Sequence, residues 1–183
     1  MCDKKALRAR FAKVRAEVRS EEADRRMFAQ LRRSSYWAAE RFFVYCAVGT
    51  EADTRLIIEA LLAEGKRVCV PRIENGRMLA APYGKLVKGA YGIPAPETGE
   101  DTPCEVALTP LLAVDAEGYR LGYGGGYYDA YFARHPEILR VGLCYAAQLT
   151  DRLPREEQDV PLQAVVMENG VIPFDACHFR ALR

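Results

Sequence analysis

Little in this chain of 183 residues points to a specialised environment or partner. Lys and Arg number 26 and Asp and Glu number 25, so the net charge is only +1. Such a balance provides no general attraction to nucleic acid or to an acidic membrane, and we expect neither as a partner. No apolar run approaches the length of a membrane span, and residues 1–5 lack the apolar segment of a signal peptide. We therefore expect a cytoplasmic protein.

Metal-binding and nucleophile motifs are also scarce. The six cysteines are widely spaced and none forms a Cys-x-x-Cys pair, which argues against the common zinc motifs. Cys46, Cys69 and Cys144 lie in apolar runs, where we expect reduced core cysteines, whereas Cys104 is expected in an accessible loop. Only two histidines occur, and neither has neighbours typical of a catalytic triad or a metal site.

The standard phosphate-binding motifs are absent, but one unusual glycine-rich run is present. No glycine loop ends in Gly-Lys-Ser/Thr, and counted from Gly122 the sixth position of a dinucleotide fingerprint is Tyr127. Residues 120–129 read RLGYGGGYYD instead. Its glycines free the backbone, so that N–H groups can converge on an anion. Arg120, at the entrance of the loop, is suited to bind a phosphate as a bidentate donor.

The same run supplies aromatic rings and a carboxylate. Tyr123, Tyr127 and Tyr128 bring flat amphipathic rings to the loop, and Asp129 can ligate magnesium or cap a following helix. An anion, a ring and a cation can therefore meet within a few residues, which suggests a nucleoside triphosphate beside an aromatic substrate. The alternative is a plain turn with packed tyrosines, because glycine clusters often mark ordinary turns.

Apolar periodicity predicts an α/β arrangement in a chain of single-domain length. An apolar run at 42–47 is followed by a helix from Asp53 or Thr54 to residue 64 and by a strand at 68–71. This β-α-β pattern favours a parallel sheet, and residues 84–103, rich in glycine and proline, are expected to form a long surface loop. The remaining expectations are helices at 4–18, 20–33 and 127–134 and strands at 77–83, 106–112 extending to 114, 139–145, 164–167 and 171–172.

Charged residues outside the glycine run have two interpretations each. Lys4 and Arg8 are neighbours on one helix face, where they either reach phosphates or only face solvent. Glu51 follows the first strand and is either a ligand contact or an acid at a helix entrance. Asp129 and Asp159 are candidate magnesium carboxylates, although the sequence does not show that they meet.

Together these segments resemble the 5-formyltetrahydrofolate cyclo-ligase family, also called methenyltetrahydrofolate synthetase, over nearly the whole chain. The run at 120–129 is the most specific element, and the order and spacing of further segments add independent support. These segments are Lys4-x-x-Leu7-Arg8, Tyr45 to Glu51, Asp53-Thr54, Gly65-Lys66, Val70-Pro71, Tyr91-Gly92-Ile93-Pro94, Leu108-Thr109-Pro110, Asp115, Gly118, Val141-Gly142-Leu143, Gln148, Leu153-Pro154 and Asp159.

The resemblance implies a three-layer α/β/α fold, with one domain over residues 1–183 and a mostly parallel central sheet. It also implies conversion of 5-formyltetrahydrofolate to 5,10-methenyltetrahydrofolate with ATP and Mg²⁺. A formamide oxygen is a poor leaving group, and phosphorylation of that oxygen lets N10 of the folate attack and close the ring. The expected substrate is a folate, with or without a polyglutamate tail, bound by a monomer.

Site roles follow from the resemblance residue by residue. Catalysis is implied for Arg120 and Tyr128, and magnesium binding for Asp129 and Asp159. The implied ATP contacts are Lys4, Lys5, Ala6, Leu7, Arg8, Arg120, Leu121, Gly122, Tyr123, Gly124, Gly125, Gly126, Tyr127 and Tyr128. The implied folate contacts are Glu51, Cys46, Tyr123 and Tyr127.

Two positions depart from the family pattern. Gln158 stands where the family often has His, and Ala95 stands where bacterial members often have Glu. Two other functions therefore remain open beside the cyclo-ligase: a paralogue that keeps the nucleotide loop but acts on another substrate, and a non-catalytic sensor of folate or nucleotide.

Overall fold

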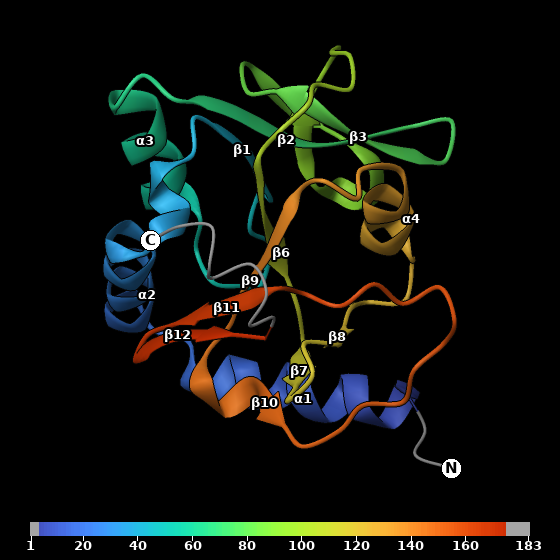
Figure 1. The fold of residues 1–183 in the computed structure, drawn as a ribbon. Coiled ribbons are helices and arrows are strands. Elements are labelled where there is room, and N and C mark those ends of the chain that lie inside the picture. Colours follow the sequence, from blue (N-terminus) through green and yellow to red (C-terminus); the bar gives the residue numbers. More distant parts are fainter. Residues whose placement is uncertain (1–3, 175–183) are drawn as a thin grey trace.

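A seven-stranded sheet forms the centre of the computed structural model, which describes residues 4–174 (Figure 1). The inner strands run parallel, which confirms the prediction of a mostly parallel sheet, and the outermost strand at each edge pairs antiparallel with its neighbour. In spatial order the strands are β12 (Gly170–Pro173), β11 (Ala164–Met167), β9 (Leu139–Leu143), β6 (Val106–Pro110), β1 (Arg41–Val44), β2 (Arg67–Glu74) and β3 (Arg77–Pro82).

Helices cover both faces of this sheet, which confirms the three-layer α/β/α prediction. On one face α2 (Glu21–Arg33) and α3 (Arg55–Ala63) pack against Phe42 and Val44. On the other face α4 (Tyr127–Arg134) packs against Phe43. The side chains of β1 alternate between the faces because consecutive strand residues point in opposite directions.

A small second sheet separates the first helix from the main sheet. It consists of β8 (Arg120–Leu121), β7 (Ala113–Asp115) and β10 (Leu149–Thr150), and α1 (Lys4–Val18) packs beside it through Phe11 (Figure 1). The predicted strand at 106–114 is therefore divided between two sheets. The chain crosses from one sheet to the other at Leu111 and Leu112, whose carbonyls accept the amide N–H groups of Gln148.

Helix ends follow the local signals in the sequence. Ser20 caps α2, where its Oγ accepts a hydrogen bond from the N–H of Ala23. Asp53 Oδ1 accepts the N–H of Arg55 at the start of α3, and Gly65 takes a left-handed φ of +77° just after that helix. None of the helices within residues 4–174 is long and apolar enough to cross a membrane.

Three expectations need correction. Residues 84–103 are not a plain loop, because β4 (Leu86–Lys88) and β5 (Pro94–Pro96) form a hairpin around a short 3₁₀ turn at Ala90–Gly92. Cys104 is buried, where its thiol donates to the carbonyl of Thr102. Strand β1 ends at Val44, short of the predicted end, because the chain then turns into the loop that carries Glu51.

The cysteine prediction is otherwise confirmed within the described part of the chain. Cys69 and Cys144 are buried and free, and Cys46 is half-buried and free. Cys2, Cys177 and His178 lie outside the described residues.

Asp115 joins the β7–β8 turn to the segment that leads to Asp159. Its carboxylate is buried, and Oδ1 accepts the N–H groups of Glu117 and Tyr119, both at 3.0 Å. Oδ2 accepts from Leu153 N and from Arg155 Nη2, both at 3.1 Å. One side chain therefore fixes both the strand before the glycine loop and the segment around residue 153.

We predict that Asp115→Ala lowers the free energy of unfolding by about 3 kcal/mol, because it leaves several buried donors without an acceptor. Urea denaturation checks this value. Glu117→Ala is the matched control, since it removes the exposed partner of Arg155 and should have a much smaller effect. Equal losses in the two variants would show that the buried carboxylate does not organise this region.

Candidate active site

Glu51 is a buried carboxylate on the loop between β1 and α3. Its side chain accepts two hydrogen bonds, from Tyr123 Oη to Oε1 at 2.9 Å and from Val48 N to Oε2 at 2.8 Å. Burial raises the pKa of Glu51, and the Val48 N–H, the Tyr123 hydroxyl and the charge of Arg15 oppose this rise. The glycine run and the β1 loop therefore meet at Glu51, which the sequence alone could not show.

Cys46, the other folate contact expected near β1, keeps a neutral thiol. Burial and the neighbouring charge of Glu51 raise the pKa of Cys46 to about 11. A thiol with such a pKa is mostly protonated at neutral pH, so it can line a binding site but does not act as a nucleophile.

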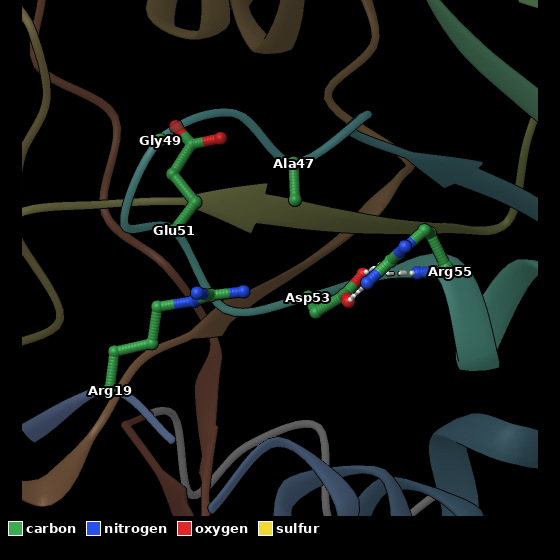
Figure 2. Close-up of a pocket in the computed structure, with 6 residues that line it drawn as sticks. All are labelled: Arg19, Ala47, Gly49, Glu51, Asp53 and Arg55. Atoms are coloured by element: carbon green, nitrogen blue, oxygen red, sulfur yellow. Dashed lines mark hydrogen bonds and ion pairs between the residues drawn. The ribbon is translucent and has the colours of Figure 1, made fainter. Parts of the chain in front are cut away.

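A pocket of about 230 Å³ adjoins the Glu51 loop, and Figure 2 shows its lining residues. Arg55 binds Asp53 on one side, with Nη2 and Oδ2 2.5 Å apart. Arg19 reaches in from the other side, and the Glu51 carboxylate points toward Gly49 and away from both arginines (Figure 2). The loop therefore separates the Glu51 carboxylate from a polar pocket behind it.

The glycine run follows β8 and leads into α4, and two of its glycines take left-handed backbone angles. Gly124 has φ +99° and Gly126 has φ +65°. A Cβ atom on Gly124 would lie 3.1 Å from the guanidinium carbon of Arg8. Arg8 also donates from Nε to the carbonyl of Gly122 at 3.0 Å. Both glycines therefore suit the backbone turn, and Gly124 also leaves room for the close approach of Arg8.

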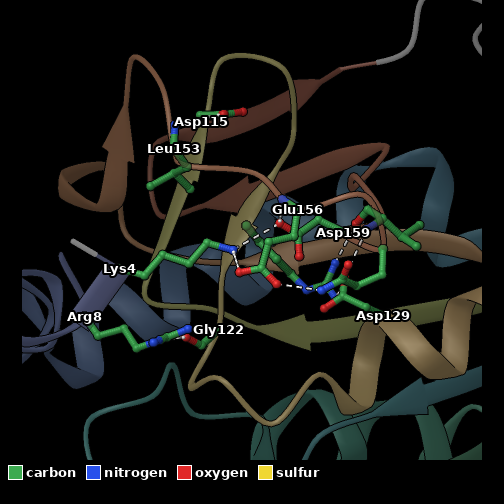
Figure 3. Close-up of polar contacts among 11 residues, drawn as sticks. Lys4, Arg8, Asp115, Gly122, Asp129, Leu153, Glu156 and Asp159 are labelled. Carbon is green, nitrogen blue, oxygen red and sulfur yellow. Dashed lines mark hydrogen bonds and ion pairs between the residues drawn. The ribbon is translucent and has the colours of Figure 1, made fainter. Parts of the chain in front are cut away.

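Lys4, at the start of α1, lies among carboxylates from the segment around residue 158. Its Nζ is 2.7 Å from Glu156 Oε1 and 3.3 Å from Asp159 Oδ2 (Figure 3). Partial burial lowers the pKa of Lys4, but the two carboxylates outweigh that effect and the pKa is raised overall. Gln158 extends the group by donating to Glu156. Lys4 is therefore a firmly charged cation with two acidic partners.

Arg120, which the sequence places at the loop entrance as a bidentate phosphate partner, is enclosed by other parts of the chain. Its guanidinium donates to Asp129 Oδ1 at 2.9 Å and to the carbonyl of Val160 at 2.7 Å, and it lies 5.2 Å from the Phe132 ring centre. Burial lowers the pKa of Arg120. In this structure Arg120 holds Asp129 in place, and its contact with a nucleotide stays a prediction.

Asp129 binds the segment 156–160, which carries Asp159. Asp129 Oδ1 accepts the N–H of Val160 at 3.0 Å, and Val160 is the residue directly after Asp159. No group of three or more His, Cys, Asp or Glu side chains within the described range could hold a metal. Two carboxylates fit Mg²⁺, which commonly completes its octahedron with phosphate oxygens and water.

The three tyrosines of the run point in different directions. Tyr128 packs inward, with its ring centre 6.1 Å from that of Phe43. Tyr123 is 56% exposed, and Tyr127 shares a hydroxyl–hydroxyl hydrogen bond of 2.7 Å with Tyr91. Tyr91, at the tip of the β4–β5 hairpin, is 77% exposed and has a φ of 55°. Exposed rings therefore flank the loop, while one ring supports it from below.

Further residues that were expected to contact the nucleotide have other surroundings in the structure. Lys5 and Ala6 are exposed on α1, while Leu7 packs on the apolar cluster that includes the buried Leu121. Gly125 lies against the Tyr127 ring.

Two residues that we did not predict belong to this region. Glu156 pairs with Lys4, and Arg15 of α1 is buried against Thr50 and Tyr123. Arg15 lies seven residues after Arg8 and so falls on the same helix face, a signal that the sequence contains. Glu156 has no comparable signal, because its position depends on how a loop folds back.

Comparisons with known proteins agree on one family. The sequence profile described as the 5-formyltetrahydrofolate cyclo-ligase family matches residues 1–168. The 5-formyltetrahydrofolate cyclo-ligase of Escherichia coli (strain K12) is 36% identical, with 70% of this chain and 78% of the relative aligned. A probable 5-formyltetrahydrofolate cyclo-ligase of Caenorhabditis elegans is 30% identical, with 94% of this chain and 96% of the relative aligned.

A solved structure supports the same assignment. The NMR structure of 5,10-methenyltetrahydrofolate synthetase from Aquifex aeolicus superposes with a TM-score of 0.82 at 29% identity, covering 93% of this chain and 92% of that one. Sequence profile, relatives and fold thus place this chain, with its glycine run and its buried glutamate, in the 5-formyltetrahydrofolate cyclo-ligase family.

Proposed function

We propose that this protein converts 5-formyltetrahydrofolate to 5,10-methenyltetrahydrofolate in a reaction that consumes ATP and requires Mg²⁺. One observation supports this proposal above the others. Helix α1, the glycine run and the segment 156–160 bring two cations and two carboxylates together, and Tyr123 links the same glycine run to Glu51. In this arrangement a magnesium-bound phosphate chain would lie beside a buried acid.

The residues of the nucleotide side are suited to hold a polyanion. Lys4 and Arg8 lie on one face of α1, and the backbone of Gly124 to Gly126 can present N–H groups to phosphate oxygens. Asp129 and Asp159 would hold Mg²⁺ between that phosphate chain and the protein. When bound, magnesium would neutralise charge on the phosphate oxygens during transfer.

The residues of the folate side are suited to bind a flat ring with hydrogen-bond donors. Glu51 can accept N–H groups of a pterin, and Tyr123 offers an exposed ring and Tyr127 a partly buried one on either side of the glycine run. In the expected reaction, the γ-phosphoryl group of ATP passes to the formyl oxygen. N10 then attacks the formyl carbon, and the oxygen leaves as inorganic phosphate. The protein's contribution is chiefly alignment of the two substrates and stabilisation of charge.

The family relation points to a small folate substrate, while a monomeric state and a cytoplasmic location stay predictions. A paralogue acting on another substrate, or a folate or nucleotide sensor, would share the glycine run but differ in turnover.

Mixing the purified protein with 5-formyltetrahydrofolate, ATP and Mg²⁺ tests the proposal directly. We expect a rise in the near-ultraviolet absorbance of the methenyl product that requires both ATP and magnesium. Folded protein that binds ATP without producing this rise would instead support the paralogue or the sensor.

We predict that Arg120→Ala lowers kcat by about a hundredfold, as removal of one preorganised donor at a site of developing charge typically does. Steady-state kinetics measure the loss, and Arg152→Ala, at an exposed position, is the control for removal of one positive charge. Near-normal turnover of Arg120→Ala would refute a catalytic contribution of this side chain.

We predict that Asp129→Asn raises the Mg²⁺ concentration needed for half-maximal activity. The amide oxygen of Asn can still accept from Val160 N and Arg120, so a purely structural role would survive this change, whereas metal binding would weaken. Titration of activity with Mg²⁺ at saturating ATP is the measurement. An unchanged titration curve would refute magnesium binding by Asp129 and limit its role to the contacts with Val160 and Arg120.

A further inference from the structure

Arg15 is a buried cation whose hydrogen bonds go to neutral groups. Its side chain lies on α1, and the residue is 5% exposed. Its Nε donates to Thr50 Oγ1 at 3.1 Å and its Nη1 donates to the carbonyl of Leu111 at 3.3 Å. Burial of a guanidinium is unfavourable unless nearby groups compensate for the lost hydration. The buried charge of Arg15 therefore calls for a nearby group of opposite charge.

The contacts of Arg15 lie on two sides of Glu51. Thr50 is the residue directly before Glu51 in the loop. On the other side, the guanidinium carbon of Arg15 lies 5.5 Å from the ring centre of Tyr123, the residue whose hydroxyl donates to Glu51. Arg15 thus contacts both the backbone neighbour and the side-chain partner of the same carboxylate.

Among the titratable groups that act on Glu51, Arg15 is the one that carries a positive charge. The titratable groups that act on it from the neighbouring elements are Arg15 of α1, Tyr45 and Cys46 after β1, Tyr123 of the glycine run and Tyr128 of α4. The tyrosines and the cysteine have raised pKa values and are neutral, including Tyr123, whose pKa rises to about 12 through burial and Glu51. Arg19 and Arg55 lie on the pocket side of the loop, where they act on Asp53 (Figure 2).

Helix α1 also connects Arg15 to the nucleotide side. Lys4, Arg8 and Arg15 are separated by four and seven residues, so the three side chains lie along one face of the helix. Arg8 and Arg15 are about 10 Å apart along the axis, from the rise per residue of an α-helix. One helix face therefore reaches the glycine run with Arg8 and the Glu51 loop with Arg15.

We propose that Arg15 is a positioning residue for the folate substrate, which aligns Glu51 through Thr50 and Tyr123 and keeps its carboxylate charged for binding. This inference rests on the proposed function, in which Glu51 accepts hydrogen bonds from the folate. Arg15 does not touch the reacting atoms. It acts through Glu51, so its loss should weaken folate binding more than nucleotide binding.

Arg15→Met tests this inference, with Arg15→Lys as the conservative variant and Lys13→Met as the control. Lys13 is exposed on the same helix and pairs only loosely with Glu17, so its loss removes one charge away from Glu51. For Arg15→Met we expect the KM for 5-formyltetrahydrofolate to rise about tenfold, which corresponds to about 1.4 kcal/mol, with the KM for ATP changed less than twofold. Arg15→Lys should restore part of the loss, and Lys13→Met should behave like the unmodified protein.

The pH profile separates electrostatic positioning from a structural role. Loss of the nearby positive charge raises the pKa of Glu51, because the ionised form loses a favourable partner. Folate binding that needs ionised Glu51 is lost as pH falls, so the acid limb of kcat/KM for folate should move to higher pH in Arg15→Met. A parallel rise of both KM values with an unchanged acid limb would overturn the inference and assign Arg15 to helix packing.

Calorimetric titration of folate into each variant without ATP keeps the inference distinct from the proposed function. Folate binding that is weaker in Arg15→Met than in Lys13→Met supports the inference, even if no methenyl product forms. If the unmodified protein forms product and Arg15→Met binds folate equally well at matched thermal stability, the proposed function stands and the inference fails.

Discussion

The ion pair between Arg120 and Asp129 holds together the side of the site proposed to bind the nucleotide. It joins β8 to α4, and both partners also bind the backbone of Val160, so three separate segments meet at one partly buried contact. Removal of Asp129 would leave the charge of Arg120, whose side chain is only 5% exposed, without its compensating partner. The glycine run lies between the two ends of this contact, and its shape therefore depends on the ion pair.

Charge neutralisation within the site is the second constraint. Lys4 pairs with Glu156 and Asp159, so cations suited to phosphate and carboxylates suited to magnesium satisfy one another before any ligand arrives. A bound magnesium nucleotide would exchange these partners and would not simply add new ones. The net free energy gained from each new contact is then smaller than the full energy of that contact, because an existing contact is lost. We expect bound metal to raise the affinity for the nucleotide, and bound nucleotide to raise the affinity for the metal.

The sequence predicted the layers of the fold because its local signals agree with one another. Ser20, Asp53 and Gly65 end or begin helices where the structure has them, and the alternation at Phe42 and Phe43 reflects a sheet covered on both faces. The division of residues 106–114 between two sheets was not predictable, because the partners at the crossing point, Gln148 and Leu121, are distant in sequence.

The candidate site was predicted as a set of residues but not as a set of contacts. The glycine run could be recognised from its composition. The hydrogen bond between Tyr123 and Glu51, in contrast, joins positions that only the folded chain brings together. Likewise, the sequence places Arg120 at the entrance of the loop as a phosphate donor, and its burial under Phe132 follows from the packing of α4 on the sheet.

The hydroxyl pair of Tyr91 and Tyr127 ties the tip of the β4–β5 hairpin to the first residue of α4, directly after the glycines. A ligand that enters the glycine run from this side must pass that pair or replace its hydrogen bond.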